Sequence, residues 1–145
     1  MTAPVGTFLG FDYGGRRLGV AVGESVTGAA RPLVTLPSRD GQPDWTEVER
    51  LISEWRPAAL VVGVPFHADG SESTSTRGAR RLARRLSGRT GLVVHEVDER
   101  LSSHEAAQRL RAAGHGVTSA RDKQRLDAVA AQVILETWFQ QQGVS

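Results

Sequence analysis

The feature that most constrains the fold is a short apolar run, "AALVVGVP", at residues 58–65. No polar residue alternates with its apolar ones, so a strand built from it has no face that can lie against water. Runs of this kind are typical of a strand whose sheet is covered on both faces. The run therefore predicts an α/β protein in which a sheet lies between layers of helices.

Further strands and helices are predicted on either side of this run. Residues 7–12 and 18–22 are β-rich and flank a Gly-Gly-Arg-Arg turn, which predicts an antiparallel hairpin. Hydrophobic periodicity and helix-ending residues indicate the other elements. They are strands at 31–37 and 91–97 and helices at 44–55, 73–86 (ended by Gly88), 102–113 and 126–142. This order, three strands followed by alternating helices and strands, predicts a mixed sheet with helices on both faces.

Composition limits the kind of protein. A chain of 145 residues is most simply one domain, 1–145, with a single core. The absence of cysteine excludes disulfides and thiolate zinc ligands. Neither a signal-like segment nor a long apolar run is present, so we expect a cytoplasmic location. The formal charge is +2, and all but one of the 18 basic residues are arginine, which favours anionic partners slightly.

Three acidic residues stand where carboxyl ends of strands or an apolar helix stripe are expected: Asp12, Glu99 and Asp127. Ligand chemistry in α/β sheets gathers beyond the carboxyl ends of strands, so the three could meet there. Two like charges about 4 Å apart repel by roughly 4 kcal/mol at an effective dielectric near 20. Such a cluster holds either protons or cations, and oxygen-only ligands suit Mg²⁺ or Mn²⁺. A pair of these ions can clamp the attacking and leaving oxygens of a phosphodiester.

Each acid also has a simpler interpretation. Asp12 could be a turn residue that accepts hydrogen bonds from the Gly-Gly amides following it. Glu99 could form a surface ion pair with Arg100 or Arg109. Asp127 could lie in the first turn of its helix, where an acidic side chain is stabilising.

Five stretches of the chain resemble, in order, the signature stretches of the YqgF family, small bacterial proteins that are similar to the RuvC resolvases and regarded as pre-16S rRNA nucleases. They are "LGFDYGGRRLGVAV", "ARPL", "VVGVPFHADGS", "VDERLSSHEA" and "LDAVAAQVIL", and together they cover nearly the whole chain. The resemblance implies an RNase H-like fold with a five-stranded mixed sheet whose first three strands are antiparallel. It also implies that Asp12, Glu99 and Asp127 are catalytic residues and ligands of Mg²⁺ or Mn²⁺, two ions in all.

The function that this resemblance implies is metal-dependent hydrolysis of phosphodiester bonds in 5′-end processing of pre-16S rRNA, a step of ribosome biogenesis. The alternative is a Holliday junction resolvase-like endonuclease that acts on branched DNA in recombination and repair. The implied partners are nucleic acid and pre-ribosomal particles, without a membrane, for a monomer or homodimer. Two other functions stay open: an ATP-binding fold of the actin and sugar-kinase kind, for which the chain is short, and a binding module without catalysis.

The chain departs from the family pattern at a few positions. Gly23 and Glu24 replace a common Ser-Asp, and His67 replaces a common Asn, which puts loop contacts in question. Ala130 stands where the similar resolvases carry a second helix acid, so three acids remain to hold two ions. Asp98 is the nearest further carboxylate that could assist.

Four arginines are candidates for nucleic-acid contact: Arg16, Arg17, Arg77 and Arg100. The first two occupy the turn beside Asp12, where a guanidinium can hold phosphate oxygens bidentately. Arg77 follows a run of small hydroxyl residues at a predicted helix N-terminus, a position that suits anions. A solvated turn and a mobile loop are the simpler interpretations, and a solvated face is the simpler one for the arginine-rich helix that follows.

Overall fold

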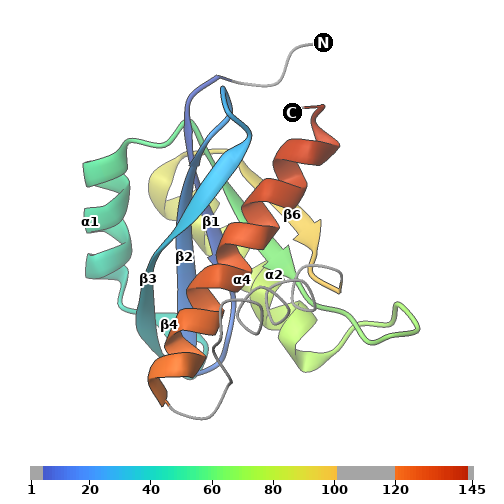
Figure 1. The fold of residues 1–145 in the computed structure, drawn as a ribbon. Coiled ribbons are helices and arrows are strands. Elements are labelled where there is room, and N and C mark those ends of the chain that lie inside the picture. The colour runs from blue at the N-terminus through green and yellow to red at the C-terminus, as the bar shows by residue number, and fades with distance from the viewer. Residues whose placement is uncertain (1–4, 101–119, 144–145) are drawn as a thin grey trace.

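The computed structural model describes residues 5–100 and 120–143 and shows a sheet with helices on both faces (Figure 1). In chain order the elements are β1 (Thr7–Asp12), β2 (Arg17–Glu24), β3 (Ala29–Arg39), β4 (Gln42–Pro43), α1 (Trp45–Trp55), β5 (Ala59–Val64), α2 (Thr74–Thr90), β6 (Val94–Asp98) and α4 (Ala120–Gln141). The helix predicted at 102–113 lies outside the described residues.

The strands lie in the order β4-β3-β2-β1-β5-β6. The pairs β1–β2 and β2–β3 are antiparallel, whereas β1–β5 and β5–β6 are parallel, so the predicted mixed sheet with three antiparallel strands first is confirmed. The predicted number of five strands was wrong, because the two-residue β4 adds a sixth by pairing with the end of β3. A strand of two residues is too short to show a period-2 pattern in the sequence.

Each face of the sheet has its own hydrophobic core. Leu9 and Phe11 of β1 pack with α1 and α2 on one face, whereas Phe8 packs with α4 on the other. This alternation is the period of two that a strand requires. All six residues of β5 are buried, as the apolar run at 58–65 predicts for a strand covered on both faces.

The helices on the first face have well-defined ends. At the start of α1, the Asp44 side chain accepts a hydrogen bond from the Thr46 amide. Ser73 and Thr76 form a reciprocal capping box at the start of α2. The prediction that Gly88 ends this helix was wrong, because the helix continues to Gly91, which has a φ of 72° and forms the C-cap.

On the opposite face, α4 lies very close to the sheet because the strands beneath it carry glycine. A Cβ atom on Gly19 of β2 would overlap the backbone carbonyl of Asp127, and one on Gly63 of β5 would overlap the Ile134 side chain. The two glycines therefore set how near the helix, and with it Asp127, comes to β2 and β5. Among the described residues, no helix has the length and hydropathy needed to cross a membrane.

We expect Gly19→Ala to destabilise the protein by about 1–3 kcal/mol, because the new methyl group meets backbone that cannot move without shifting α4. The free energy of unfolding from urea titration measures this. Gly15→Ala is the matched control, since its Cβ would have no atom within 4 Å. Equal stabilities of the two variants would show that α4 does not depend on the glycine.

Candidate active site

Asp12 is the last residue of β1 and lies between two glycines of the neighbouring strands. It is level with Gly19 in β2 and with Gly63 in β5. Counting back along β1, it shares the α4 face with Phe8 and Gly10. Because neither neighbour has a side chain, the space beside this carboxylate is left to groups from α4 and from the end of β6.

Glu99 directly follows β6 and is only 7% exposed. Its backbone amide donates a hydrogen bond of 2.9 Å to the carbonyl of Val64, which continues the parallel pairing by one residue beyond the strand. Its Oε2 atom lies 3.5 Å from the position that a Cβ of Gly63 would take. The Glu99 side chain thus extends over β5 toward Asp12.

The carboxyl group of Asp12 is in an unfavourable electrostatic environment. Burial, a hydrogen bond with Glu99 and the charges of Glu99 and Asp127 together raise the pKa of Asp12 well above its ordinary value. Its Oδ1 atom is buried and has no hydrogen-bond partner within the described residues. The three predicted acids are therefore close enough to interact, from segments far apart in the sequence.

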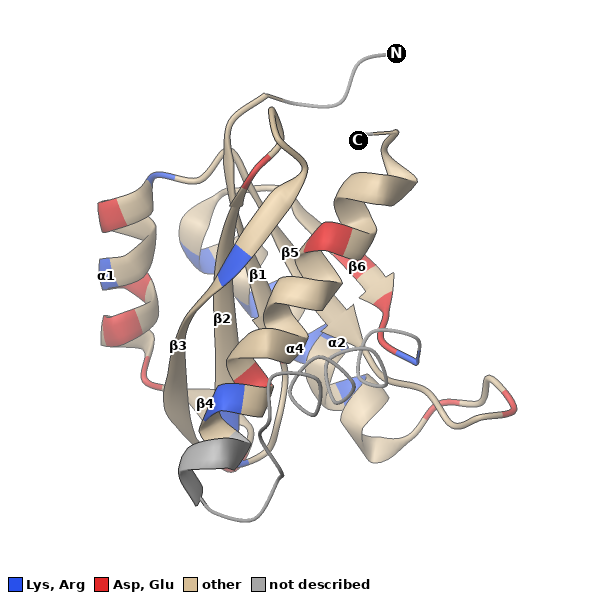
Figure 2. Ribbon diagram, viewed as in Figure 1, with Lys and Arg blue, Asp and Glu red and all other residues tan. Residues whose placement is uncertain are grey.

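Asp127 is the third of these acids, and an arginine neutralises it. The Arg17 Nε atom lies 2.6 Å from Asp127 Oδ2, with the side chains 37% and 22% exposed respectively. Figure 2 shows a basic and an acidic position close together in the lower part of α4. Since α4 begins at Ala120, Asp127 lies beyond the first turn, and the interpretation of a first-turn acid was wrong.

The oxygen atoms of the three carboxylates are ligands of the kind that a hard divalent cation prefers, although the three side chains are not gathered around one point. All three side chains offer oxygen only, as Mg²⁺ and Mn²⁺ prefer, and the buried Oδ1 of Asp12 has no hydrogen-bond partner within the described residues. Within the parts of the chain that the structure describes, no three acidic or histidine side chains are gathered tightly enough to hold a metal ion. Asp12 and Glu99 interact directly, whereas Asp127 is paired with Arg17.

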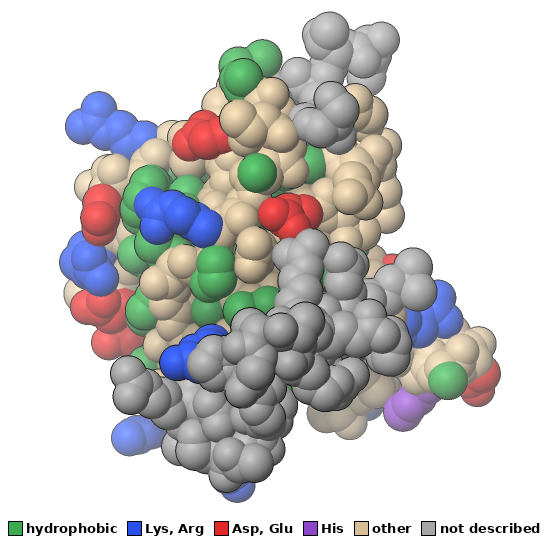
Figure 3. All heavy atoms as spheres, in the orientation of Figure 1, with side chains coloured by type: hydrophobic (Ala, Val, Ile, Leu, Met, Phe, Trp, Pro, Cys, Tyr) green, Lys and Arg blue, Asp and Glu red, His purple; other side chains and the backbone are tan. Residues whose placement is uncertain are grey.

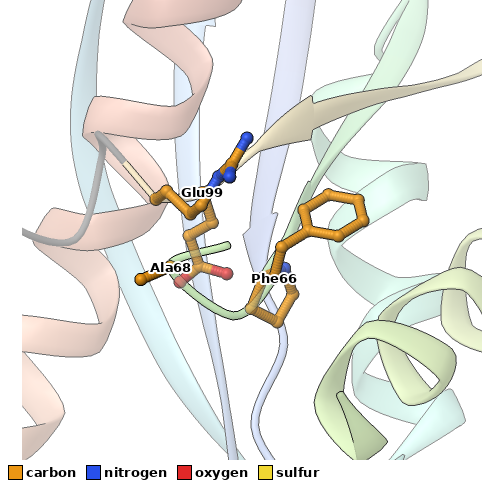
Figure 4. Close-up of a pocket in the computed structure, with 5 residues that line it drawn as sticks. Phe66, Ala68 and Glu99 are labelled. Carbon is orange, nitrogen blue, oxygen red and sulfur yellow. The ribbon is translucent and has the colours of Figure 1, made fainter. Parts of the chain in front are cut away.

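A cleft of about 510 Å³ opens beside Glu99. Its lining residues are Pro65, Phe66, Ala68, Glu99 and Arg100. Figure 4 shows the Glu99 carboxylate and the Phe66 ring at its walls. The guanidinium groups of Arg80 and Arg100 lie 5.4 and 5.7 Å from the centre of this ring. Phe66 was not predicted as a site residue, and its only signal in the sequence is an aromatic residue shortly after a strand that ends at the candidate site.

The loop between β5 and α2 is tied down at both ends. At the first end, the Thr76 hydroxyl donates to the carbonyl of Pro65, and at the second end Ser73 forms the capping box with Thr76. Within the loop, the His67 amide donates to the Ser71 carbonyl at 2.9 Å. The wall of the cleft at Phe66 is thereby fixed to the start of α2.

The four predicted nucleic-acid contacts differ in their surroundings. Arg16 and Arg77 are exposed and form no ion pair among the described residues. Arg17 is held by Asp127, and Arg100 pairs with Asp98, whose Oδ2 lies 2.6 Å from the Arg100 Nη2 atom.

The hydrogen bond with Arg100 lowers the pKa of Asp98. Arg100 thus pairs with Asp98, and Arg109, the other suggested partner of Glu99, lies outside the described residues. On the face seen in Figure 3, the described basic and acidic side chains are interspersed. The excess of arginine is therefore not gathered into one patch on that face.

The known proteins that this chain resembles carry the names of nucleases and resolvases. Residues 6–141 match the RuvX family, which is described as Holliday junction resolvase. The chain is 46% identical over 136 residues to a protein of Enterobacter sp. (strain 638), covering 94% of this chain and 97% of the relative. It is 50% identical over 134 residues to one of Azotobacter vinelandii, covering 90% and 91%. Both relatives are named "Putative pre-16S rRNA nuclease".

Solved structures of Holliday junction resolvases have the same fold. Thermus thermophilus RuvC in complex with a Holliday junction substrate matches with a TM-score of 0.54 and 18% identity, covering 95% of this chain and 96% of that chain. The fowlpox virus resolvase, also with junction DNA, matches with a TM-score of 0.53 and 8% identity, covering 93% and 97%. At these identities the likeness establishes the RuvC-like, RNase H-like fold.

We expect Asp12→Asn to raise the melting temperature in the presence of chelator, because the variant replaces a carboxyl group whose charged form is disfavoured by burial and by Glu99. A gain of about 1 kcal/mol would shift the melting temperature by roughly 2–4 °C. Asp98→Asn is the control, since that carboxylate is stabilised by Arg100 and its loss should bring no gain. A variant less stable than the wild type would mean that Asp12 supports the fold.

Proposed function

The chain belongs to the RuvX family, which corresponds to the YqgF resemblance of its motifs, and from that premise we propose that it is a divalent-metal-dependent nuclease of pre-16S rRNA. It would hydrolyse phosphodiester bonds in 5′-end processing, in the cytoplasm, as a step of ribosome biogenesis. The names of relatives that match this chain over nearly their whole length support this substrate. The two relatives come from different bacteria and carry the same name.

The observation that carries the proposal is the buried Oδ1 atom of Asp12, a half-buried residue, which has no hydrogen-bond partner within the described residues. A buried acid without a full set of partners costs stability, and such groups persist where function requires them. The proximity of Glu99 and Asp127 adds like charge, which a structural role would avoid. A divalent cation would remove this penalty, and this is why we assign the cluster to metal binding.

In this proposal the three acids are the ligands of the metal ions, and other described residues contact the nucleic acid. Asp12 would hold the ions together with Glu99 and Asp127. When bound, Mg²⁺ or Mn²⁺ activates a water molecule and stabilises charge on the oxygens of the phosphodiester. Asp98 would not assist, because Arg100 holds it on the surface. The proposed site thus has three carboxylates, whereas the similar resolvases have a fourth.

The exposed arginines would position the substrate. Arg16 lies in the turn that follows Asp12 and is free to contact phosphate oxygens, and Arg77 lies in the first turn of α2. Arg100 lines the cleft beside Glu99, where its pairing with Asp98 leaves part of the guanidinium exposed. The backbone of the substrate would then run along the edge of the sheet at which β1, β5 and β6 end.

Cleavage of branched DNA is the second candidate, since the family description and the RuvC-like neighbours name Holliday junctions. The two functions use the same chemistry and differ in substrate. The relatives at 46–50% identity favour RNA, whereas the resolvases are similar at 18% or less. We therefore place rRNA processing first.

We expect the wild type to cleave a precursor 16S rRNA fragment with Mg²⁺ or Mn²⁺ and to lose this activity in EDTA. Asp12→Asn should lower the rate more than about 100-fold, because several kcal/mol of transition-state stabilisation depend on the ions. The measurement compares labelled rRNA fragments with four-way DNA junctions, with Asp98→Asn as the control. Full activity in chelator or in Asp12→Asn would contradict the site, and cleavage of junctions alone would favour the resolvase.

Binding of RNA should weaken as salt rises, because arginine–phosphate contacts release counterions. Arg16→Gln should lower the affinity and reduce the slope of log K against log salt by about one. Fluorescence anisotropy at several salt concentrations measures both quantities. Arg50→Gln on α1, where Arg50 pairs with Glu47 and Glu54, is a control of equal charge. The same loss in both variants would exclude a specific role for Arg16.

A further inference from the structure

Arg17 forms an ion pair with Asp127, which is one of the three acids proposed to bind a metal ion. Its Nε atom lies 2.6 Å from Asp127 Oδ2, and Asp127 is one of the two charges that act on Asp12. The positive guanidinium lies against the carboxylate that a divalent cation would also approach, and the two positive charges repel each other. The ion pair therefore competes with coordination by Asp127.

The backbone of Arg17 is fixed, while its side chain has room to move. Arg17 is level with Pro37 in the sheet, and the preceding turn is pinned by hydrogen bonds from Ser38 to the carbonyl of Arg16 and from Gly41 to that of Gly15. The side chain is nevertheless 37% exposed. Ion pairs with this exposure contribute little, so the guanidinium can exchange one anionic partner for another of similar strength.

We propose that Arg17 is a positioning residue that changes partner between Asp127 and the substrate. Without a divalent ion it neutralises Asp127, and with the ion bound it leaves that carboxylate and contacts a phosphate of the nucleic acid. The inference rests on the proposed function, since it takes the three acids as the metal ligands. It makes metal binding and substrate binding favour each other, because each is helped when Arg17 leaves Asp127.

The first test is Mn²⁺ affinity without nucleic acid, measured by isothermal titration calorimetry. Arg17→Gln should bind Mn²⁺ about 5-fold more tightly than the wild type, the lower end of usual coupling between sites. The gain should vanish when Asp127→Asn is already present. Arg16→Gln is the matched control, because it removes the same charge from the same turn without touching an acid. If both arginine variants gain the same affinity for Mn²⁺, the effect comes only from the loss of a nearby positive charge. The proposed change of partner by Arg17 would then be wrong.

The second test concerns the phosphate contact and uses no metal. In EDTA, Asp127→Asn should bind a short RNA more tightly than Glu99→Gln, which removes the same charge but leaves Arg17 paired. Adding Arg17→Gln should erase this difference, as read by fluorescence anisotropy. Equal affinities of the two acid variants would overturn the proposed phosphate contact.

The proposed function and this inference can fail separately. If Asp12→Asn binds Mn²⁺ as well as the wild type, the metal site is wrong and the inference falls with it. If Asp12→Asn abolishes binding but Arg17→Gln binds Mn²⁺ no more tightly than the wild type, the metal site stands and only the exchange is overturned. Thermal melting of each variant in EDTA confirms that the compared proteins are folded.

Discussion

The burial of one carboxylate oxygen of Asp12, at the end of a central strand, is the constraint around which the rest of the site is arranged. Glycines on both neighbouring strands leave room beside it, and the same glycines let α4 come down onto the sheet. The close approach brings Asp127 within electrostatic reach of Asp12. Packing and chemistry thus depend on the same small residues, and neither can be altered without the other.

This arrangement separates the stable part of the protein from the strained part. Two cores, one on each face of the sheet, bury large apolar side chains along β1 and β5. The unfavourable charges gather at one end of those strands, where the apolar residues stop. A fold with this much apolar burial can carry a few destabilising groups, which is a common relation between stability and function.

Much of the fold was visible in the sequence, and so were the acids. The apolar run at 58–65 predicted a strand covered on both faces, and the motifs around Asp12, Glu99 and Asp127 predicted residues that do come together, although their catalytic role stays a prediction. The sixth strand was not predictable, because two residues show no periodicity. The end of α2 was misplaced because a helix can continue through a glycine such as Gly88, and only the left-handed backbone at Gly91 ends it.

The contacts between side chains were the least predictable part. Arg17 stands next to Arg16 in the sequence and looks equivalent to it, but only Arg17 reaches an acid 110 residues further along the chain. Spacing within a motif carries no information about a partner so distant, since the fold brings the two together. The same holds for Arg100, whose guanidinium could have turned to either of the two acids before it and lies against Asp98.

The loop after β5 has a consequence for how such proteins diversify. Its two ends are anchored, at Pro65 by the Thr76 hydroxyl and at Ser73 by the capping box, so its tip is independent of the sheet. Lengthening a chain segment between fixed anchors costs little entropy. Insertions or deletions at the tip would therefore reshape the cleft while leaving Glu99 in register, so this wall can vary without rebuilding the edge of the sheet that holds the acids.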